Sequence, residues 1–323
     1  MGEPIEAIIN EKENYQKVYK NYKEFVELLL KILHSESNER PKRINIFTTN
    51  YDLLFENAFD SINDPLSFFN DGSKGFIKRK ISNKNFFLNV TQSGYGDKYK
   101  REIPTINLFK MHGSLSWERE SSNKDLIVNY DSTHINKLTN ILIGDDTELT
   151  EENVKSLFEL NVVIEDYEGE EDMIYEYINN YLNGIVISNT ILEHFENEYE
   201  KILIINPDKR KFRDTVLDEH YFQQIRSLSY ELEKDNSVLI VFGFSFADEH
   251  IQSIFERSLL NPSLDVYIIY YSEDTLHELK NIKFVNYKNI RYLPPNNKLE
   301  DGEILKGNFD YLMNLLGGKS NVE

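Results

Sequence analysis

Two places in the chain share the feature that most limits its fold: a short, mostly apolar strand that runs directly into polar, reactive residues. The first strand, residues 44–47, leads into Thr-Thr-Asn-Tyr-Asp at 48–52. The second, residues 103–111, leads into Lys-Met-His-Gly-Ser at 110–114. In an open α/β sheet, ligands bind in the crevice outside the carboxyl ends of the strands. The pattern therefore predicts an α/β sheet with a site built from these two segments.

Composition excludes several kinds of chemistry. The chain has 323 residues, of which 40% are hydrophobic and 13% aromatic. That is enough for one large α/β domain or two smaller ones with a sizeable core. The absence of cysteine excludes a disulfide framework, a cysteine zinc site and thiolate chemistry. The seven histidines show no metal-ligand spacing, so we expect no metal.

Charge and hydropathy exclude further classes of function. The formal net charge of −19, from 36 basic and 55 acidic residues, repels phosphate backbones and anionic lipid. We therefore expect no direct nucleic-acid binding and no membrane binding, although solubility alone also explains an acidic surface. No stretch approaches the roughly 20 apolar residues that span a bilayer, and the N-terminus lacks an apolar signal region. These features predict a cytoplasmic protein.

The order of the expected elements indicates the fold class. Apolar strands alternate with amphipathic segments, which predicts a doubly wound, Rossmann-like parallel sheet with an inserted helical region. The domains expected are an N-terminal amphipathic helix at 1–40, a Rossmann-type domain formed by 41–114 and 201–323, and an inserted cap or subdomain at 115–200. The other expected strands are 202–205, 237–242, 265–270 and 282–285, and the expected helices are 4–36, 53–59, 217–234, 249–259 and 273–280.

Each candidate site segment also has a purely structural interpretation. Thr49 and Asp52 stand three apart, close to a capping box, although capping leaves Asn50 unexplained. His112 fits a histidine satisfied at a strand end beside a glycine turn. The segment 243–248, Gly-Phe-Ser-Phe-Ala-Asp, follows a buried strand and could offer a hydroxyl and free N–H groups to an anion. It is equally consistent with an ordinary loop whose aspartate caps the next helix.

Taken together, the segments are more specific than any one of them. Segments 48–52, 110–114 and 243–251, with Asn206-Pro207 and Lys211 after their own expected strand, resemble sirtuin-like (Sir2-type) domains in order and position. They resemble in particular the zinc-less bacterial branch that hydrolyses NAD in antiviral defence. The resemblance implies hydrolysis of NAD⁺ to nicotinamide and ADP-ribose, as the effector of a bacterial antiphage system.

The resemblance also implies a role for each matched residue. Asn50 would position the ribose and the attacking water, and His112 would be the general base. Asp52 would bond the nicotinamide carboxamide, while Gly243 and Ser245 would line the adenosine half. The residues implied to be catalytic are Asn50 and His112, and those implied to bind NAD are Thr48, Thr49, Asp52, Gly243 and Ser245.

Two departures from the family pattern qualify these expectations. Sirtuin deacetylases carry a four-cysteine zinc module after the His-Gly segment, and residues 115–200 occupy that place here. Protein deacetylation is therefore disfavoured. The family also begins with a strand and a Gly-Ala-Gly loop, whereas the only glycine before residue 44 is Gly2. Either such a unit lies upstream of residue 1, or the chain has lost it and is a catalytically silent nucleotide-sensing or scaffolding subunit that regulates a partner ATPase or nuclease.

The amphipathic helix at 4–36 leads to an expectation about partners. Its tyrosine-rich apolar stripe can pack on the chain's own sheet, as most such stripes do, or on a neighbouring molecule. We expect a homo-oligomer, and the resemblance implies a hexameric HerA-type ATPase or another defence protein as a further partner.

Overall fold

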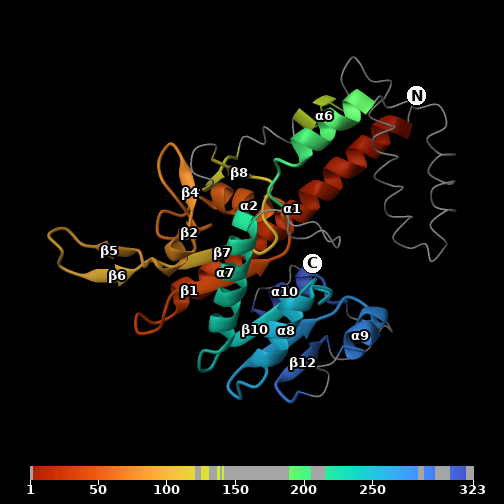
Figure 1. Ribbon diagram of the computed structural model, residues 1–323. Coiled ribbons are helices and arrows are strands. Elements are labelled where there is room, and N and C mark those ends of the chain that lie inside the picture. The colour runs from red at the N-terminus through yellow and green to blue at the C-terminus, as the bar shows by residue number, and fades with distance from the viewer. Residues whose placement is uncertain are drawn as a thin grey trace.

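The computed structural model describes most of the chain outside the middle third (Figure 1). The described residues are 3–120, 125–130, 137–138, 140–141, 189–204, 215–282, 287–294 and 306–317.

The first half of the fold is a parallel sheet covered by the N-terminal helix. Strands β1 (Arg43–Thr48), β7 (Thr105–Lys110) and β2 (Phe68–Asn70) pair in parallel in the order β1-β7-β2. All six residues of the central strand β7 are buried, as expected for a strand covered on both faces. Helices α1 (Glu3–Ser35) and α2 (Leu54–Ile62) pack on this sheet through one apolar cluster.

Helix α1 confirms the expectation that its stripe packs on the chain's own sheet. Its buried side chains contact α2 and β7, whereas Tyr15 and Val18, nearer the start of the helix, are 51% and 42% exposed. The buried members of the stripe are Tyr22, Val26, Leu29, Leu30 and Leu33.

The second half of the fold is another three-stranded parallel sheet. Its strands are β10 (Val238–Phe242), β11 (Asp265–Ile269) and β12 (Ile290–Leu293), in that order. Helices α7 (Thr215–Leu232), α8 (Glu249–Ser258), α9 (Glu273–Lys280) and α10 (Phe309–Leu315) accompany it. Figure 1 shows α7 between the two halves, and it contacts both α8 and the 3₁₀ helix η1 (Asn83–Phe87).

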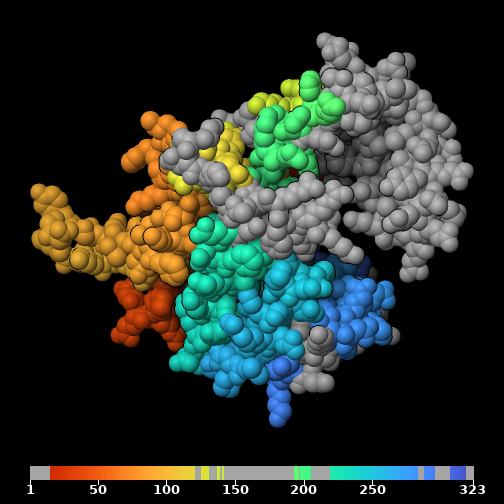
Figure 2. All heavy atoms as spheres, in the orientation of Figure 1, coloured from red at the N-terminus to blue at the C-terminus, as the bar shows by residue number. Residues whose placement is uncertain are grey.

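A third set of strands is antiparallel and lies beside the first half. Strands β3 (Ser73–Lys74), β4 (Arg79–Ile81), β9 (Leu126–Val128) and β8 (Trp117–Arg119) form one sheet. Strands β5 (Thr91–Ser93) and β6 (Lys100–Glu102) form a hairpin that projects from the body of the molecule (Figure 2). The remaining named helix is α6 (Asn189–Tyr199).

The structure corrects several expectations about elements. Residues 117–119 and 126–128 are strands, not helices. Residues 126–128 pair with β4, and residues 117–119 pair with residues 126–128. The expected strand at 202–205 is only a bridge between Ile204 and Gly113 in its described part. Residues 283–285 of the expected strand 282–285 lie outside the described residues, and β12 was not predicted.

The fold is α/β with parallel sheets, as predicted, but the doubly wound arrangement stays a prediction. Among the described residues, no strand pairs with both β1 and β10, so the parallel strands form two sheets. The domain boundaries also stay predictions, since most of residues 115–200 lie outside the described part of the chain. None of the described helices has the length and apolar character needed to cross a membrane.

Candidate functional site at the strand ends

The loop after β1 is held by local hydrogen bonds. The backbone N–H of Asn50 donates to Thr48 Oγ1 (3.1 Å), and that of Leu54 donates to Asp52 Oδ1 (2.9 Å). Asn50 is exposed, and its side-chain amide donates to the hydroxyl of Tyr22 on α1 at 3.5 Å. The loop therefore presents the Asn50 amide to solvent beside a tyrosine from the N-terminal helix.

The capping-box interpretation of this loop is wrong. Helix α2 begins at Leu54, and its N-cap residue, Leu53, has no side-chain cap. Thr49 makes no cap bond, and Asp52 bonds only the first amide of the helix. Asp52 thus has a structural contact, but Asn50 has none with the helix and stays available to a ligand.

The loop after β1 and the loop after β7 are joined to each other. The Met111 N–H donates to the Thr48 carbonyl (2.8 Å), and the Leu115 N–H donates to the Tyr51 carbonyl (3.0 Å). Parallel pairing already places Thr48 opposite Lys110. The structure therefore brings the first two predicted segments together, with Asn50 and His112 on adjacent strand ends.

His112 is held by a carboxylate from the second half of the fold. His112 Nε2 lies 3.1 Å from Asp248 Oδ2, and the Tyr221 hydroxyl donates to the same oxygen at 3.1 Å. Asp248 also caps α8, since its Oδ1 accepts the N–H groups of His250 (2.9 Å) and Ile251 (3.1 Å). The side chain of Asp248 is 6% exposed and that of His112 is 19% exposed, so a ligand can reach the ring of the histidine.

These contacts set the protonation states of Asp248 and Tyr221. Burial alone would raise the pKa of Asp248, but hydrogen bonds from His112, the Ile251 amide and Tyr221 outweigh it and hold the pKa well below its usual range. Burial and the Asp248 charge both raise the pKa of Tyr221, which keeps its hydroxyl a donor. Because an ionised aspartate only accepts hydrogen bonds, His112 Nε2 is the donor in this contact.

Gly113 explains why this histidine stands where it does. Its φ is +86°, and a Cβ at this position would lie 2.0 Å from the Leu203 carbonyl oxygen. The next residue, Ser114, donates its N–H to the same carbonyl (3.2 Å). Only glycine fits this close approach, so the segment around Leu203 fixes the turn that carries His112.

The third predicted segment is joined to the second through its aspartate. Gly243 (φ +63°) and Ser245 are exposed at the end of β10, and a Cβ on Gly243 would meet nothing within 4 Å. Ser245 Oγ accepts the Ala247 N–H at 3.4 Å. Asp248 then connects the segment to His112. Asn206, Pro207 and Lys211, which the resemblance also matched, lie outside the described residues.

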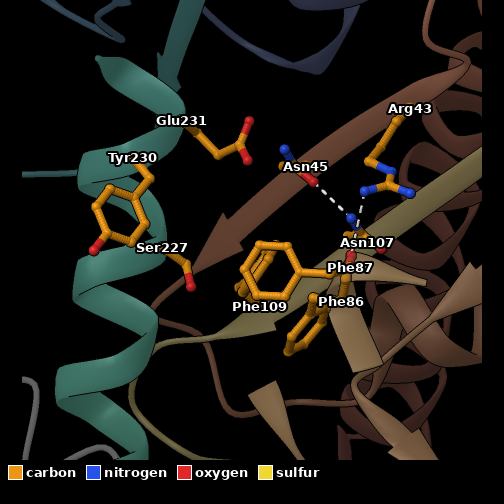
Figure 3. A pocket seen from close by; sticks show the side chains of 9 residues that line it. All are labelled: Arg43, Asn45, Phe86, Phe87, Asn107, Phe109, Ser227, Tyr230 and Glu231. Carbon is orange, nitrogen blue, oxygen red and sulfur yellow. Dashed lines mark hydrogen bonds between the residues drawn. The ribbon is translucent and has the colours of Figure 1, made fainter. Parts of the chain in front are cut away.

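The cavity drawn in Figure 3 lies elsewhere. It has a volume of about 20 Å³, which holds little more than a water molecule. Figure 3 shows it between the edge of β1 and α7, where Asn107 donates to Asn45 at 2.7 Å. None of the predicted site residues lines it, so the candidate site is the open surface at the strand ends.

Three site residues were missed by the sequence analysis. Tyr22 was expected only as part of the apolar stripe of α1, and Tyr221 lay in the expected helix 217–234 without a predicted role. Asp248 was recognised only as a cap. The cap prediction is confirmed, but its contact with His112 joins residues 136 positions apart, and no local sequence signal could reveal it.

Parallel strands that present polar side chains at their carboxyl ends are typical of the α/β proteins that bind ligands there. Comparison with protein families identifies the family: a SIR2-like domain matches residues 44–293, and the chain belongs to this family. The resemblance noted in the sequence is therefore confirmed. No curated protein matches the chain.

SIR2-like domains use NAD, so the function of the chain is NAD-related. The site suits one end of that molecule. The exposed Asn50 amide, Asp52 and His112 supply donors and acceptors for an amide and ribose hydroxyls. Before β1, however, the described chain is the helix α1, with no glycine-rich turn that could approach a diphosphate. The described residues thus offer polar groups at the strand ends but no glycine-rich loop before β1.

Proposed function

We propose that this protein is an NAD⁺ glycohydrolase that releases nicotinamide and ADP-ribose. The observation that carries the proposal is the hydrogen bond between His112 and Asp248, which orients a histidine beside Asn50 at the ends of β1 and β7. Family membership supports NAD as the substrate. A carboxylate that holds the far nitrogen of a histidine is a recurring way to prepare a general base.

The reaction breaks the bond between the nicotinamide nitrogen and ribose C1′. Its electron pair goes to the nicotinamide, which leaves neutral and needs little acid catalysis, while the sugar passes through an oxocarbenium-like state. Asn50 orients the water whose oxygen bonds C1′, and Asp52 bonds the carboxamide. His112 Nδ1 takes the proton that the water loses, and the Asp248 carboxylate stabilises the resulting imidazolium. The proton then passes to solvent.

The biological role follows the family resemblance. We propose that the enzyme acts in the cytoplasm as the effector of a bacterial antiphage system, as a homo-oligomer that can also dock on a hexameric HerA-type ATPase. Two exposed features of the described chain support an assembly: Tyr15 on α1, and the projecting β5–β6 hairpin, whose Tyr95 is 99% exposed. If light scattering showed a fully active monomer at every concentration, the proposed oligomer would be contradicted.

One observation favours a second candidate function. Without a glycine-rich diphosphate loop, half of the NAD contact is missing from the described chain. A protein of this kind could bind a nucleotide without turning it over, as a sensing or scaffolding subunit of a partner ATPase or nuclease.

Incubating the purified protein with NAD⁺ separates the two functions. We expect nicotinamide and ADP-ribose in equal amounts, and a rate about 10²-fold lower for Asn50→Ala, because mispositioning by about 1 Å can cost that much. Since Asn50 caps no helix, the melting temperature of this variant should match the parent. Binding of NAD⁺ without nicotinamide release would support the silent subunit and contradict the enzyme.

A further inference from the structure

Beneath the candidate site lies a buried ion pair to which neither the family resemblance nor the proposed reaction gives a role. Lys110, the last residue of β7, is 3% exposed. Its Nζ lies 3.3 Å from Oε1 of Glu56 on α2, whose side chain is 8% exposed. Charged side chains are rarely buried to this degree, and a buried pair is seldom retained for stability alone.

The position of the lysine within the site suggests what it does. Lys110 Nζ donates to the Asn50 carbonyl at 3.4 Å and also to the Asp52 carbonyl. Both carbonyls belong to the loop that carries the asparagine and aspartate implied to contact NAD. A single ammonium group therefore holds this loop from beneath at two points, and a rigid support of this kind is what an orienting side chain requires.

Glu56 serves as the counter-ion of the lysine. Burial raises the pKa of Glu56, and the neighbouring Lys110 opposes that rise. Its Oε2 is buried with no hydrogen-bond partner among the described residues. A carboxylate in such surroundings is costly to bury, so its presence is best explained by the need to keep a charged lysine under the loop.

We propose that Lys110 is a positioning residue that sets the orientation of Asn50 and Asp52, with Glu56 as the counter-ion that keeps it buried. The proposal rests on the proposed function for its effect on rate, but its structural part can be measured without turnover. Lys110 touches no reacting atom. It acts on the loop backbone, and the loop side chains act on the substrate.

A double substitution separates positioning from stability. Removing one member of a buried pair is strongly destabilising, whereas replacing both by apolar residues is often neutral. We expect Lys110→Met to lower the melting temperature by more than about 5 °C, and adding Glu56→Met to restore most of that loss. The rate of nicotinamide release should stay about 10²-fold low in both variants, because both lack the donor that holds the loop.

Two further variants keep the test decisive if the double variant folds poorly. Glu56→Gln retains the lysine and its bonds to both carbonyls, so its folded fraction should lose less than about tenfold in rate, far less than Lys110→Met. Lys20→Met is the matched control, because Lys20 pairs with Glu24 (3.6 Å) on the exposed face of α1 and should change neither property.

Hydrogen exchange gives a readout that does not depend on activity. The Leu54 amide bonds to Asp52 Oδ1 and the Leu115 amide bonds to the Tyr51 carbonyl. Both should exchange faster in the Lys110→Met/Glu56→Met protein than in the parent at equal global stability. Parent-like exchange in the double variant, or equal rate losses in Glu56→Gln and Lys110→Met, would overturn the proposal. If the parent released no nicotinamide but the double variant still exchanged these amides faster than the parent, only the proposed function would be contradicted.

Discussion

The two halves of the candidate site are built very differently. The loops after β1 and β7 are tied to each other by backbone hydrogen bonds and supported by the buried Lys110. The loop after β10 is exposed at Gly243 and Ser245, and its Asp248 contacts His112 of the loop after β7. The half that would hold the nicotinamide ribose is thus fixed before a ligand arrives. The half implied to hold the adenosine is an open surface.

We therefore place the proposed chemistry in the first half, and Asp248 is the residue whose side chain joins the loop after β10 to His112. Aromatic contacts support the same junction, since Phe309 of α10 packs against Phe242 of β10 (4.9 Å) and Tyr22 of α1 (5.2 Å). A change at Asp248 should therefore affect rate, as should a change of the loop residues Asn50 and His112, whereas a change in the backbone packing of either half should affect mainly stability.

The largest expected effect is that of Asp248→Asn on rate. Asparagine caps a helix as well as aspartate does, so α8 should be retained. The variant loses the charge that fixes the histidine tautomer and stabilises the imidazolium, and nicotinamide release should fall by about 10²–10⁴-fold. Parent-like turnover in this variant would mean that Asp248 serves only as the cap of α8 and has no role in the reaction.

A pair of glycines compares the packing of the halves directly. Gly113→Ala puts a Cβ 2.0 Å from a backbone oxygen at a φ of +86°, and should lower the free energy of unfolding by about 3 kcal/mol or more. Gly243→Ala, at a φ of +63° with open space around it, should cost only about 1 kcal/mol. Chemical denaturation measures both, and equal losses would contradict the contrast.

The pH dependence of stability tests the packing of α7 against β8, because the ring of His220 packs edge-on against Trp117 with ring centroids 4.8 Å apart. Burial lowers the pKa of His220 to about 4, and its Nε2 lies 2.5 Å from Gln224 Nε2, which donates to the neutral ring. Because the unfolded histidine protonates near 6.5, this contribution is complete above that pH and is lost as the pH falls toward 4. The loss amounts to about 3 kcal/mol at about 1.36 kcal/mol per unit.

Two variants isolate that contribution in denaturant unfolding between pH 7 and pH 4. His220→Phe should lack the stability loss in this window, while His194→Gln, at an exposed histidine of α6, should retain it. An identical pH profile for His220→Phe and the parent would mean that a group other than His220 causes the loss of stability.

Features of the fold and site with a local sequence pattern could be predicted, and features that depend on contacts between distant residues could not. The strand ends at 48–52 and 110–114, and helices such as 273–280, follow from apolar patterns and were placed correctly. Strands β8 and β9 were missed because each has three residues, and β9 pairs with β4 while β8 pairs with β9. The burial of Lys110 was not predicted, because it depends on the ion pair with Glu56, a residue on another element.

The central claim is that His112, oriented by Asp248, is the base for hydrolysis of NAD⁺. The most direct test compares nicotinamide release by the parent, His112→Ala and the exposed-histidine control His194→Ala at equal folded concentration. The account predicts that His112→Ala loses about 10²–10⁴-fold in rate at equal folded concentration, and that His194→Ala matches the parent. A His112→Ala rate within a few-fold of the parent would contradict it.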